Sequence, residues 1–298
     1  MPSLRGRILR LLLRYQARKA DTHAMLQQRR AMLEDAARRL PMPPRVDVCQ
    51  TTIADMPAEW LRPADATTNG AILYLHGGAY TMGSCATHRT LAARIAIAGR
   101  TPALQPAYRL APEHPFPAAL QDCVAAYRWL VSQGIAPQKI VVAGDSAGGG
   151  LAVALAVMLR DDHVPLPAAI ACMSPWVDLE LTGESLRTRA HVDPVCSVEE
   201  SRFHARQYVG GADPRAALVS PIYADLHGLP PVLIHVGDSE ILLSDATRLA
   251  ARARDDGVDV RLTVWEGMWH VWHLLARYVP EGQRAVDDIG AFIRKHLD

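Results

Sequence analysis

Short apolar runs of four to six residues alternate along most of the chain with longer segments of helical periodicity. The predicted strands are Ala71–Leu75, Pro102–Gln105, Ile140–Ala143, Ala168–Met173, Val232–Val236 and Val260–Val264. The predicted helices between them are His88–Ala98, Pro117–Gln133, Ala147–Arg160, Ser244–Asp256 and Gln283–His296. Strands that are apolar throughout and alternate with long helices are typical of a mostly parallel sheet that is covered on both faces. The pattern therefore predicts an α/β fold.

Two parts of the chain interrupt this alternation. At the start, helices are predicted over Leu4–Lys19 and over about Thr22–Leu40, and the Pro41–Pro44 cluster ends the second one. The other part, Asp178–Val219, is polar and proline-rich, with one predicted helix near Val198–Val209 and no obvious strand. It resembles an insertion between two strands of the sheet.

The first helix has an amphipathic pattern. Its apolar residues recur at helical spacing and its arginines lie elsewhere on the wheel. The stripe consists of Leu4, Ile8, Leu11, Leu12 and Tyr15. Because most apolar helical stripes pack inward, we expect this one to cover the protein's own body. The alternative is a basic amphipathic helix that lies on a membrane surface.

Composition and charge limit the classes of function. The 298 residues are 49% hydrophobic and 21% charged, and a net charge of +1 gives no reason to expect a nucleic-acid partner. The charge is nevertheless uneven, with +8 on residues 1–45 and −7 on the remainder. No apolar stretch is long enough to predict integral membrane insertion. The five cysteines form no C-x-x-C pair, which favours a reducing, cytoplasmic location.

A candidate nucleophile follows the strand Ile140–Ala143. Gly144-Asp-Ser-Ala-Gly148 is a G-x-S-x-G motif between this strand and the helix that starts at Ala147. A strand-to-helix turn this tight strains its central residue, and small flanking residues relieve the crowding. The segment has neither the G-K-[ST] of a phosphate loop nor the G-x-G-x-x-G of a dinucleotide site. We therefore predict Ser146 as a nucleophile.

A serine nucleophile needs a base that a third group orients. His270 lies in the loop after the last predicted strand, where it can reach back across the edge of the sheet. His273 is the alternative base, although it is expected to begin the following helix. His235 lies inside an apolar strand, so we expect it to be a hydrogen-bonded core residue.

The acid is expected in the loop after Val232–Val236, which offers three carboxylates: Asp238, Glu240 and Asp245. Local chemistry does not choose between Asp238 and Glu240. Asp245 is expected on the next helix as a solvated charge.

Donors for an oxyanion are predicted at two places. His76-Gly-Gly-Ala-Tyr80 follows the strand Ala71–Leu75, and the paired glycines let the N–H groups of Gly77 and Gly78 point at one site. The third predicted donor is the N–H of Ala147, directly after the serine.

These motifs together closely resemble the bacterial hormone-sensitive-lipase-like esterases, a branch of the α/β-hydrolases. The resemblance extends over most of residues 46–298 and includes Tyr108-Arg-Leu-Ala-Pro-Glu-His-Pro-Phe-Pro-Ala118 and Ser174-Pro-Trp. It implies an α/β-hydrolase core of residues 46–177 and 221–298, with a helical cap formed by residues 1–45 and 178–220.

The chain departs from the family pattern at two positions of the site. Ala79 stands where the oxyanion motif H-G-G-G has its third glycine. Glu240-Ile-Leu replaces D-P-L, the acid motif, whose aspartate lies about thirty residues before the histidine. The resemblance therefore favours Glu240 over Asp238, and glutamate is an accepted acid in this fold. Glu113 and His114, in the motif from Tyr108, are expected to be architectural.

The resemblance implies a carboxylesterase that hydrolyses short to medium acyl esters through an acyl-enzyme, with the triad Ser146, His270 and Glu240. No metal or organic cofactor is expected. The alternatives are a serine amidase or peptidase of the same fold and a non-catalytic small-molecule receptor. The sequence leaves open the oligomeric state, a homodimer included.

Overall fold

The structure is a computed structural model that describes residues 2–17, 25–67 and 69–297. Its strands are β1 Val46–Ile53, β2 Met56–Pro63, β3 Ala71–Leu75, β4 Ala103–Pro106, β5 Ile140–Asp145, β6 Ala169–Met173, β7 Val232–Gly237 and β8 Val260–Trp265. Its α-helices are α1 Leu4–Ala17, α2 Leu26–Arg38, α3 Cys85–Gly99, α4 Ala118–Ser132, α5 Ala147–Asp161, α6 Ser185–Thr188, α7 Val198–Val209, α8 Leu243–Asp255 and α9 Pro280–Leu297. Short 3₁₀ turns lie at η1 Pro137–Lys139, η2 Pro221–Tyr223 and η3 Trp272–Leu275.

The strands form one sheet in the order β1-β2-β4-β3-β5-β6-β7-β8. All neighbours from β4 to β8 run parallel, whereas β2 is antiparallel to both β1 and β4. The predicted mostly parallel sheet is confirmed. The sequence pattern missed the β1–β2 hairpin because most side chains of β1 are exposed or half-buried, so this edge strand has no continuous apolar run.

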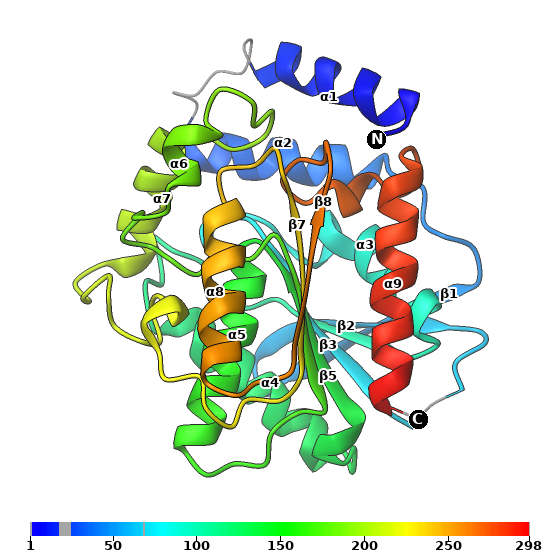
Figure 1. Ribbon diagram of the computed structural model, residues 1–298. Coiled ribbons are helices and arrows are strands. Elements are labelled where there is room, and N and C mark those ends of the chain that lie inside the picture. The colour runs from blue at the N-terminus through cyan, green and yellow to red at the C-terminus, as the bar shows by residue number, and fades with distance from the viewer. Residues whose placement is uncertain (1, 18–24, 68, 298) are drawn as a thin grey trace.

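Helices cover both faces of the sheet (Figure 1). Alternate residues of each strand face opposite sides, so Leu73 and Leu75 of β3 join the core under α4, α5 and α8. Ile72 and Tyr74 join the second core, under α3 and α9. The buried parallel strands explain why the sequence shows unbroken apolar runs here.

Helix α1 packs on the body through a different face from the one predicted. Leu9 and Leu13 contact a small core of Met268, Trp269 and Trp272, in and beside the loop after β8. The predicted stripe points outward, and its members are at least half exposed: Leu4, Ile8, Leu11, Leu12 and Tyr15. The expectation that this stripe packs inward is therefore wrong, since the contact depends on the complementary surface that α1 meets, which periodicity does not specify. Lys19, at the end of the predicted helix, lies outside the described residues.

The segment between β6 and β7 contains α7, whose bounds match the predicted helix, and the short helix α6, which the sequence analysis did not predict. Figure 1 shows α1, α2, α6 and α7 gathered at one end of the molecule. The loop after β8 contacts α1, so this is the end at which the parallel strands have their carboxyl termini. Among the helices of the described ranges, none combines the length and apolar character that crossing a bilayer requires.

Candidate active site

Ser146 lies at a sharp turn between β5 and α5 and has strained backbone angles, φ 53° and ψ −120°. The two glycines of the motif are required by close backbone approach. A Cβ at Gly144 would lie 2.3 Å from the carbonyl oxygen of Gly148, and one at Gly148 would lie 2.0 Å from that of Leu75. The turn thus places the Ser146 hydroxyl at the N-terminus of α5, above the carboxyl edge of the sheet.

His270 and Glu240 meet Ser146 from two other loops. The Oγ of Ser146 lies 2.9 Å from Nε2 of His270, and Nδ1 of His270 lies 2.8 Å from Oε2 of Glu240. All three side chains are buried. The structure therefore brings together the serine, the histidine and the acid that the sequence analysis preferred.

Glu240 is fixed by donors on its other carboxylate oxygen. The N–H of Gly237 donates to Oε1 at 2.6 Å, and the hydroxyl of Ser174 donates to the same atom at 2.8 Å. Ser174 also accepts the N–H of Val271, the neighbour of His270, at 3.2 Å. The sequence analysis gave Ser174 no role, although it begins the Ser174-Pro-Trp motif. It ties the loops of the acid and the base together.

The other candidate acids have different partners. Asp238 accepts hydrogen bonds from the N–H of Gly267 and the hydroxyl of Ser239 through Oδ1. Asp245 is buried and accepts the N–H groups of Val177 and Asp178 through Oδ2, both at 3.0 Å. The expectation that Asp245 is a solvated charge is therefore wrong. Its burial and the neighbouring Asp178 raise its pKa to about 8.

The other candidate histidines form a pair behind the site. Nδ1 of His235 lies 3.3 Å from Nε2 of His273, and Nε2 of His235 lies 2.9 Å from a carboxylate oxygen of Asp288. His235 is thus a hydrogen-bonded core residue, as predicted. Because Asp288 accepts from Nε2 of His235, the facing Nδ1 is the acceptor and His273 the donor.

The N–H of Gly77, one of the predicted oxyanion donors, forms a hydrogen bond within the protein. The N–H of Gly77 donates to Oδ1 of Asp145 at 3.1 Å, so it is directed into the body of the protein. This corrects the expectation for Gly77. Within the described chain, the N–H groups of Gly78, Ala79 and Ala147 have no hydrogen-bond acceptor.

Asp145 organises the loop that carries these groups. Besides Gly77, its carboxylate accepts the hydroxyl of Tyr74 at 2.7 Å and lies 3.2 Å from Nε2 of His88. Burial raises the pKa of Asp145, but His88 and the hydroxyl donor outweigh it, and the pKa is lowered overall. Because its pKa is lowered, the carboxylate stays ionised to lower pH than an ordinary aspartate, and it holds the start of the loop through the N–H of Gly77.

Comparison with known proteins identifies the family of the chain. A sequence profile of the alpha/beta hydrolase fold matches residues 72–274. An acetyl-hydrolase from Streptomyces hygroscopicus is 46% identical over 245 residues, which cover 82% of this chain and 81% of the relative. A solved esterase from the bacterial hormone-sensitive lipase family is 44% identical, covers 100% of both chains and has a TM-score of 0.95. The chain belongs to this family.

A second solved structure extends the comparison to a ligand experiment. EstE5 soaked with p-nitrophenyl butyrate is 43% identical, covers 99% of both chains and has a TM-score of 0.94. The predicted fold, family and carboxylesterase class of this hydrolase are thus confirmed.

Residues 178–220 of the hydrolase also reach the site. Asp193 accepts the N–H of Ile241, the neighbour of Glu240, at 2.9 Å, and also accepts the N–H of Cys196 at 3.0 Å. Burial raises the pKa of Cys196 to about 11, so its thiol is uncharged at neutral pH. The sequence analysis missed both residues, because nothing in their local pattern indicates contact with a loop about fifty residues away.

Burial and neighbouring groups shift the pKa of His270 in opposite directions. Burial lowers the pKa of His270, whereas the neighbouring Cys196 and Glu240 raise it, and the pKa lies well above its ordinary value. Because the Cys196 thiol is uncharged at neutral pH, we assign the effect to the Glu240 carboxylate. The site thus favours the protonated, imidazolium form of His270.

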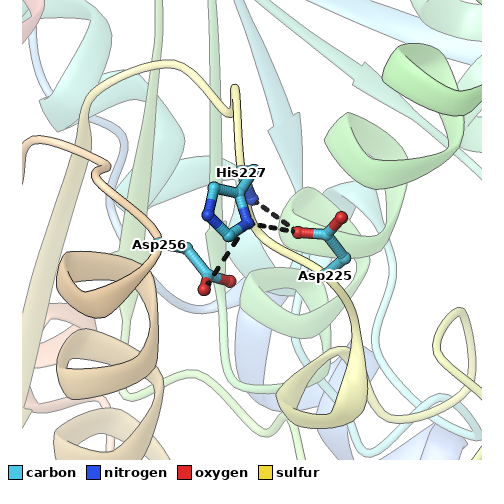
Figure 2. A group of neighbouring side chains, drawn as sticks. All are labelled: Asp225, His227 and Asp256. Atoms are coloured by element: carbon cyan, nitrogen blue, oxygen red, sulfur yellow. Dashed lines mark hydrogen bonds and ion pairs between the residues drawn. The ribbon is translucent and has the colours of Figure 1, made fainter.

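One cluster of the hydrolase has the residue types of a metal site, Asp225, His227 and Asp256 (Figure 2). It lies before β7 and after α8, at the amino edge of the sheet, opposite the serine. Nδ1 of His227 is 2.8 Å from Oδ1 of Asp225 and 3.6 Å from Oδ1 of Asp256. These contacts with the carboxylates raise the pKa of His227. The cluster is thus an ion-pair group in which Asp225 and His227 are exposed and Asp256 is half-buried.

Proposed function

We propose that this carboxylesterase hydrolyses short to medium acyl esters, with Ser146 as nucleophile, His270 as general base and acid, and Glu240 as the orienting acid. The observation that carries the proposal is the chain of contacts at 2.9 and 2.8 Å that links the three side chains. Their burial supports it further, since water is kept from the charges that develop during the reaction.

The first half of the reaction forms an acyl-enzyme. His270 takes the hydroxyl proton of Ser146 as Oγ attacks the ester carbonyl, and the carbonyl π electrons move to the oxygen. The tetrahedral intermediate then collapses, the bond to the alcohol oxygen breaks, and His270 gives its proton to the leaving alcohol. Glu240 stabilises the positive charge that the imidazole carries between these two steps.

The second half repeats these steps with water. His270 removes a proton from water, the resulting hydroxide attacks the acyl carbon, and the proton passes to Oγ of Ser146 as the carboxylic acid leaves. For the oxyanion we propose the N–H groups of Gly78 and Ala147, together with Ala79 in place of Gly77. Their lack of a protein acceptor supports this set.

For the substrate, the proposal rests on the relatives and on the cap. One relative is named an acetyl-hydrolase, and EstE5 was soaked with p-nitrophenyl butyrate. We propose that residues 1–45 and 178–220 form the cap over the core of residues 46–177 and 221–298. The contacts of Asp193 and Cys196 at the site support this division. We propose that this cap limits the length of the acyl chain that the site accepts.

We further propose that the enzyme works in the cytoplasm. All five cysteines are free thiols, and two of them, Cys123 and Cys172, are buried in the core. Free thiols are compatible with a reducing compartment.

The test is the release of nitrophenol from the acetate, butyrate, octanoate and palmitate esters by wild type and by Ser146→Ala. We expect turnover on the shorter esters and a loss of roughly 10⁴-fold or more in the variant. A matching set of nitroanilides separates an esterase from an amidase or peptidase. Ester turnover that survives in Ser146→Ala would reject the proposed nucleophile, and no turnover of any ester would favour a receptor.

A further inference from the structure

Helix α1 has two apolar faces, and only one is used inside the protein. Its inner face contacts the body through Leu9 and Leu13. Polar contacts fix its rotation, because Ser3 donates to Glu281 through N–H and hydroxyl, and Arg10 donates to the carbonyl of Val192. The helix therefore cannot turn its outer face inward without losing these contacts.

The outer face is a strip of large aliphatic side chains. Leu4 is 70% exposed, Ile8 50%, Leu11 65% and Leu12 52%. At 100° per residue these positions fall within an arc of about 100°. Four exposed aliphatic residues on one arc form a contiguous surface, which is unlike the isolated apolar residues that scatter over most protein surfaces.

Arginines border this strip on both sides. On the helical wheel the exposed Arg5 lies beyond Leu12, and the exposed Arg7 lies beyond Leu11 on the opposite border. Helix α1 contains no aspartate or glutamate. An apolar strip flanked by cations is the pattern of a helix that lies in the plane of a lipid interface, with its apolar side chains among the acyl chains and its cations at anionic headgroups.

We propose that the outer face of α1 binds the surface of a membrane that contains anionic phospholipids. Charge complementarity favours this occupant over a second copy of the chain. A symmetric contact through this face would bring Arg5 and Arg7 of two copies together with no acidic residue of α1 to oppose them. A bilayer with anionic lipids offers both an apolar interior and negative charge.

This binding orients the active site. The inner face of α1 packs on Met268, Trp269 and Trp272, which surround His270 in the chain. Figure 1 shows α1 as the outermost element at this end of the molecule. Docking through α1 therefore brings the carboxyl edge of the sheet, with Ser146, toward the lipid. The idea that esters dissolved in the membrane reach the site rests on the proposed function. The proposed binding of α1 to the membrane does not depend on it.

The test is sedimentation of the full chain with phosphatidylcholine vesicles, with and without about three parts in ten of phosphatidylglycerol. We expect the anionic vesicles to bind at least roughly tenfold more protein. Leu11→Gln/Leu12→Gln should lose binding to both vesicle types, while Arg5→Gln/Arg7→Gln should lose only the preference for anionic lipid. The matched control is Val48→Thr, an exposed apolar residue on the edge strand β1, and it should bind as wild type.

Two further measurements separate the explanations. Ser146→Ala should bind vesicles as wild type does, and the α1 variants should keep their unfolding temperature and their turnover of dissolved p-nitrophenyl butyrate. Thus a failed esterase assay with intact vesicle binding would reject only the proposed function. Equal or absent sedimentation of wild type with both vesicles would overturn the membrane proposal. A dimer that Leu11→Gln/Leu12→Gln converts to a monomer, without vesicle binding, would identify the face as a subunit interface instead.

Discussion

The guanidinium of Arg30 in α2 donates a hydrogen bond to the carbonyl oxygen of Thr81 at 2.7 Å, and thus joins the N-terminal segment to the loop that begins at His76. The same guanidinium donates to the carbonyl of Ala111 and pairs with Glu113 at 2.8 and 2.9 Å. This ion pair lowers the pKa of Glu113 to about 2. The architectural role expected for Glu113 is therefore to hold α2.

Removing the Arg30 contacts should reduce catalysis more than stability. In Arg30→Gln we expect kcat/KM to fall roughly tenfold, because the loop with Gly78 and Ala79 loses a fixed neighbour. Steady-state kinetics with p-nitrophenyl butyrate measure the effect. Arg29→Gln is the control, since Arg29 pairs with Glu200 and not with Thr81. Equal losses in both variants would show that the helix, and not the contact with Thr81, matters.

The choice of acid gives a paired prediction. Glu240→Gln should lower kcat by roughly 10³- to 10⁴-fold, because the amide cannot act as a negatively charged acceptor for His270 and for Gly237 at once. Asp238→Asn should stay close to wild type, since an amide oxygen can still accept the N–H of Gly267. The reverse order of the two activities would assign the acid to Asp238.

The pH dependence of kcat/KM should report on His270. Its pKa lies well above the ordinary value, so the imidazole keeps its proton to higher pH and the acid limb of the profile lies on the alkaline side of that value. In Glu240→Gln, the acid limb of the pH profile of the remaining activity should lie at lower pH, because the carboxylate that raises the pKa of His270 is gone. Cys196→Ala should leave it in place, because the thiol is uncharged at neutral pH. A shift in Cys196→Ala alone would assign the effect to the thiol.

We expect the buried His76 to make the folded protein less stable as the pH falls below neutral. Its ring is buried against Tyr108, and burial lowers its pKa to about 3. The unfolded chain binds a proton at this residue below about pH 6.5, and the folded chain does so only near pH 3. The contribution of His76 to the free energy of unfolding therefore decreases as the pH falls between these values, by about 2 kcal/mol from pH 6.5 to 4.5.

Urea unfolding at several pH values measures this decrease. His76→Gln should make this decrease smaller over that range, and the exposed His114→Gln should leave it unchanged. The buried His204, whose pKa burial lowers to about 4, adds to the slope in the same direction and remains in both variants. An unchanged slope in His76→Gln would show that His76 is charged in the folded protein at these pH values.

Much of the fold and site was predictable because the signals are local. The unbroken apolar strands and the helices between them identified the mostly parallel sheet. The two glycines of the motif indicated the crowded turn at Ser146, because the backbone leaves no space for a Cβ at either position. The position of His270 after the last strand followed from the order of elements alone.

The corrected predictions all concern contacts with residues that are distant in the chain. The sequence marked Gly77 as a donor, but only the folded chain shows its N–H directed at Asp145. It placed Asp245 correctly on a helix but as a solvated charge, whereas the side chain is buried and accepts hydrogen bonds from the distant Val177 and Asp178. These partners are remote in the chain, so no local pattern specifies them.

The sequence by itself determined the strand and helix order, the nucleophile turn and the candidate chemistry, because these depend on neighbouring residues. Only the tertiary structure decided that Glu240 rather than Asp238 contacts His270, and that Ser174 and Asp193 support the acid loop. It also decided which side of α1 faces outward. Periodicity shows that a helix has an apolar side, but its orientation depends on the surface that it meets when the chain folds.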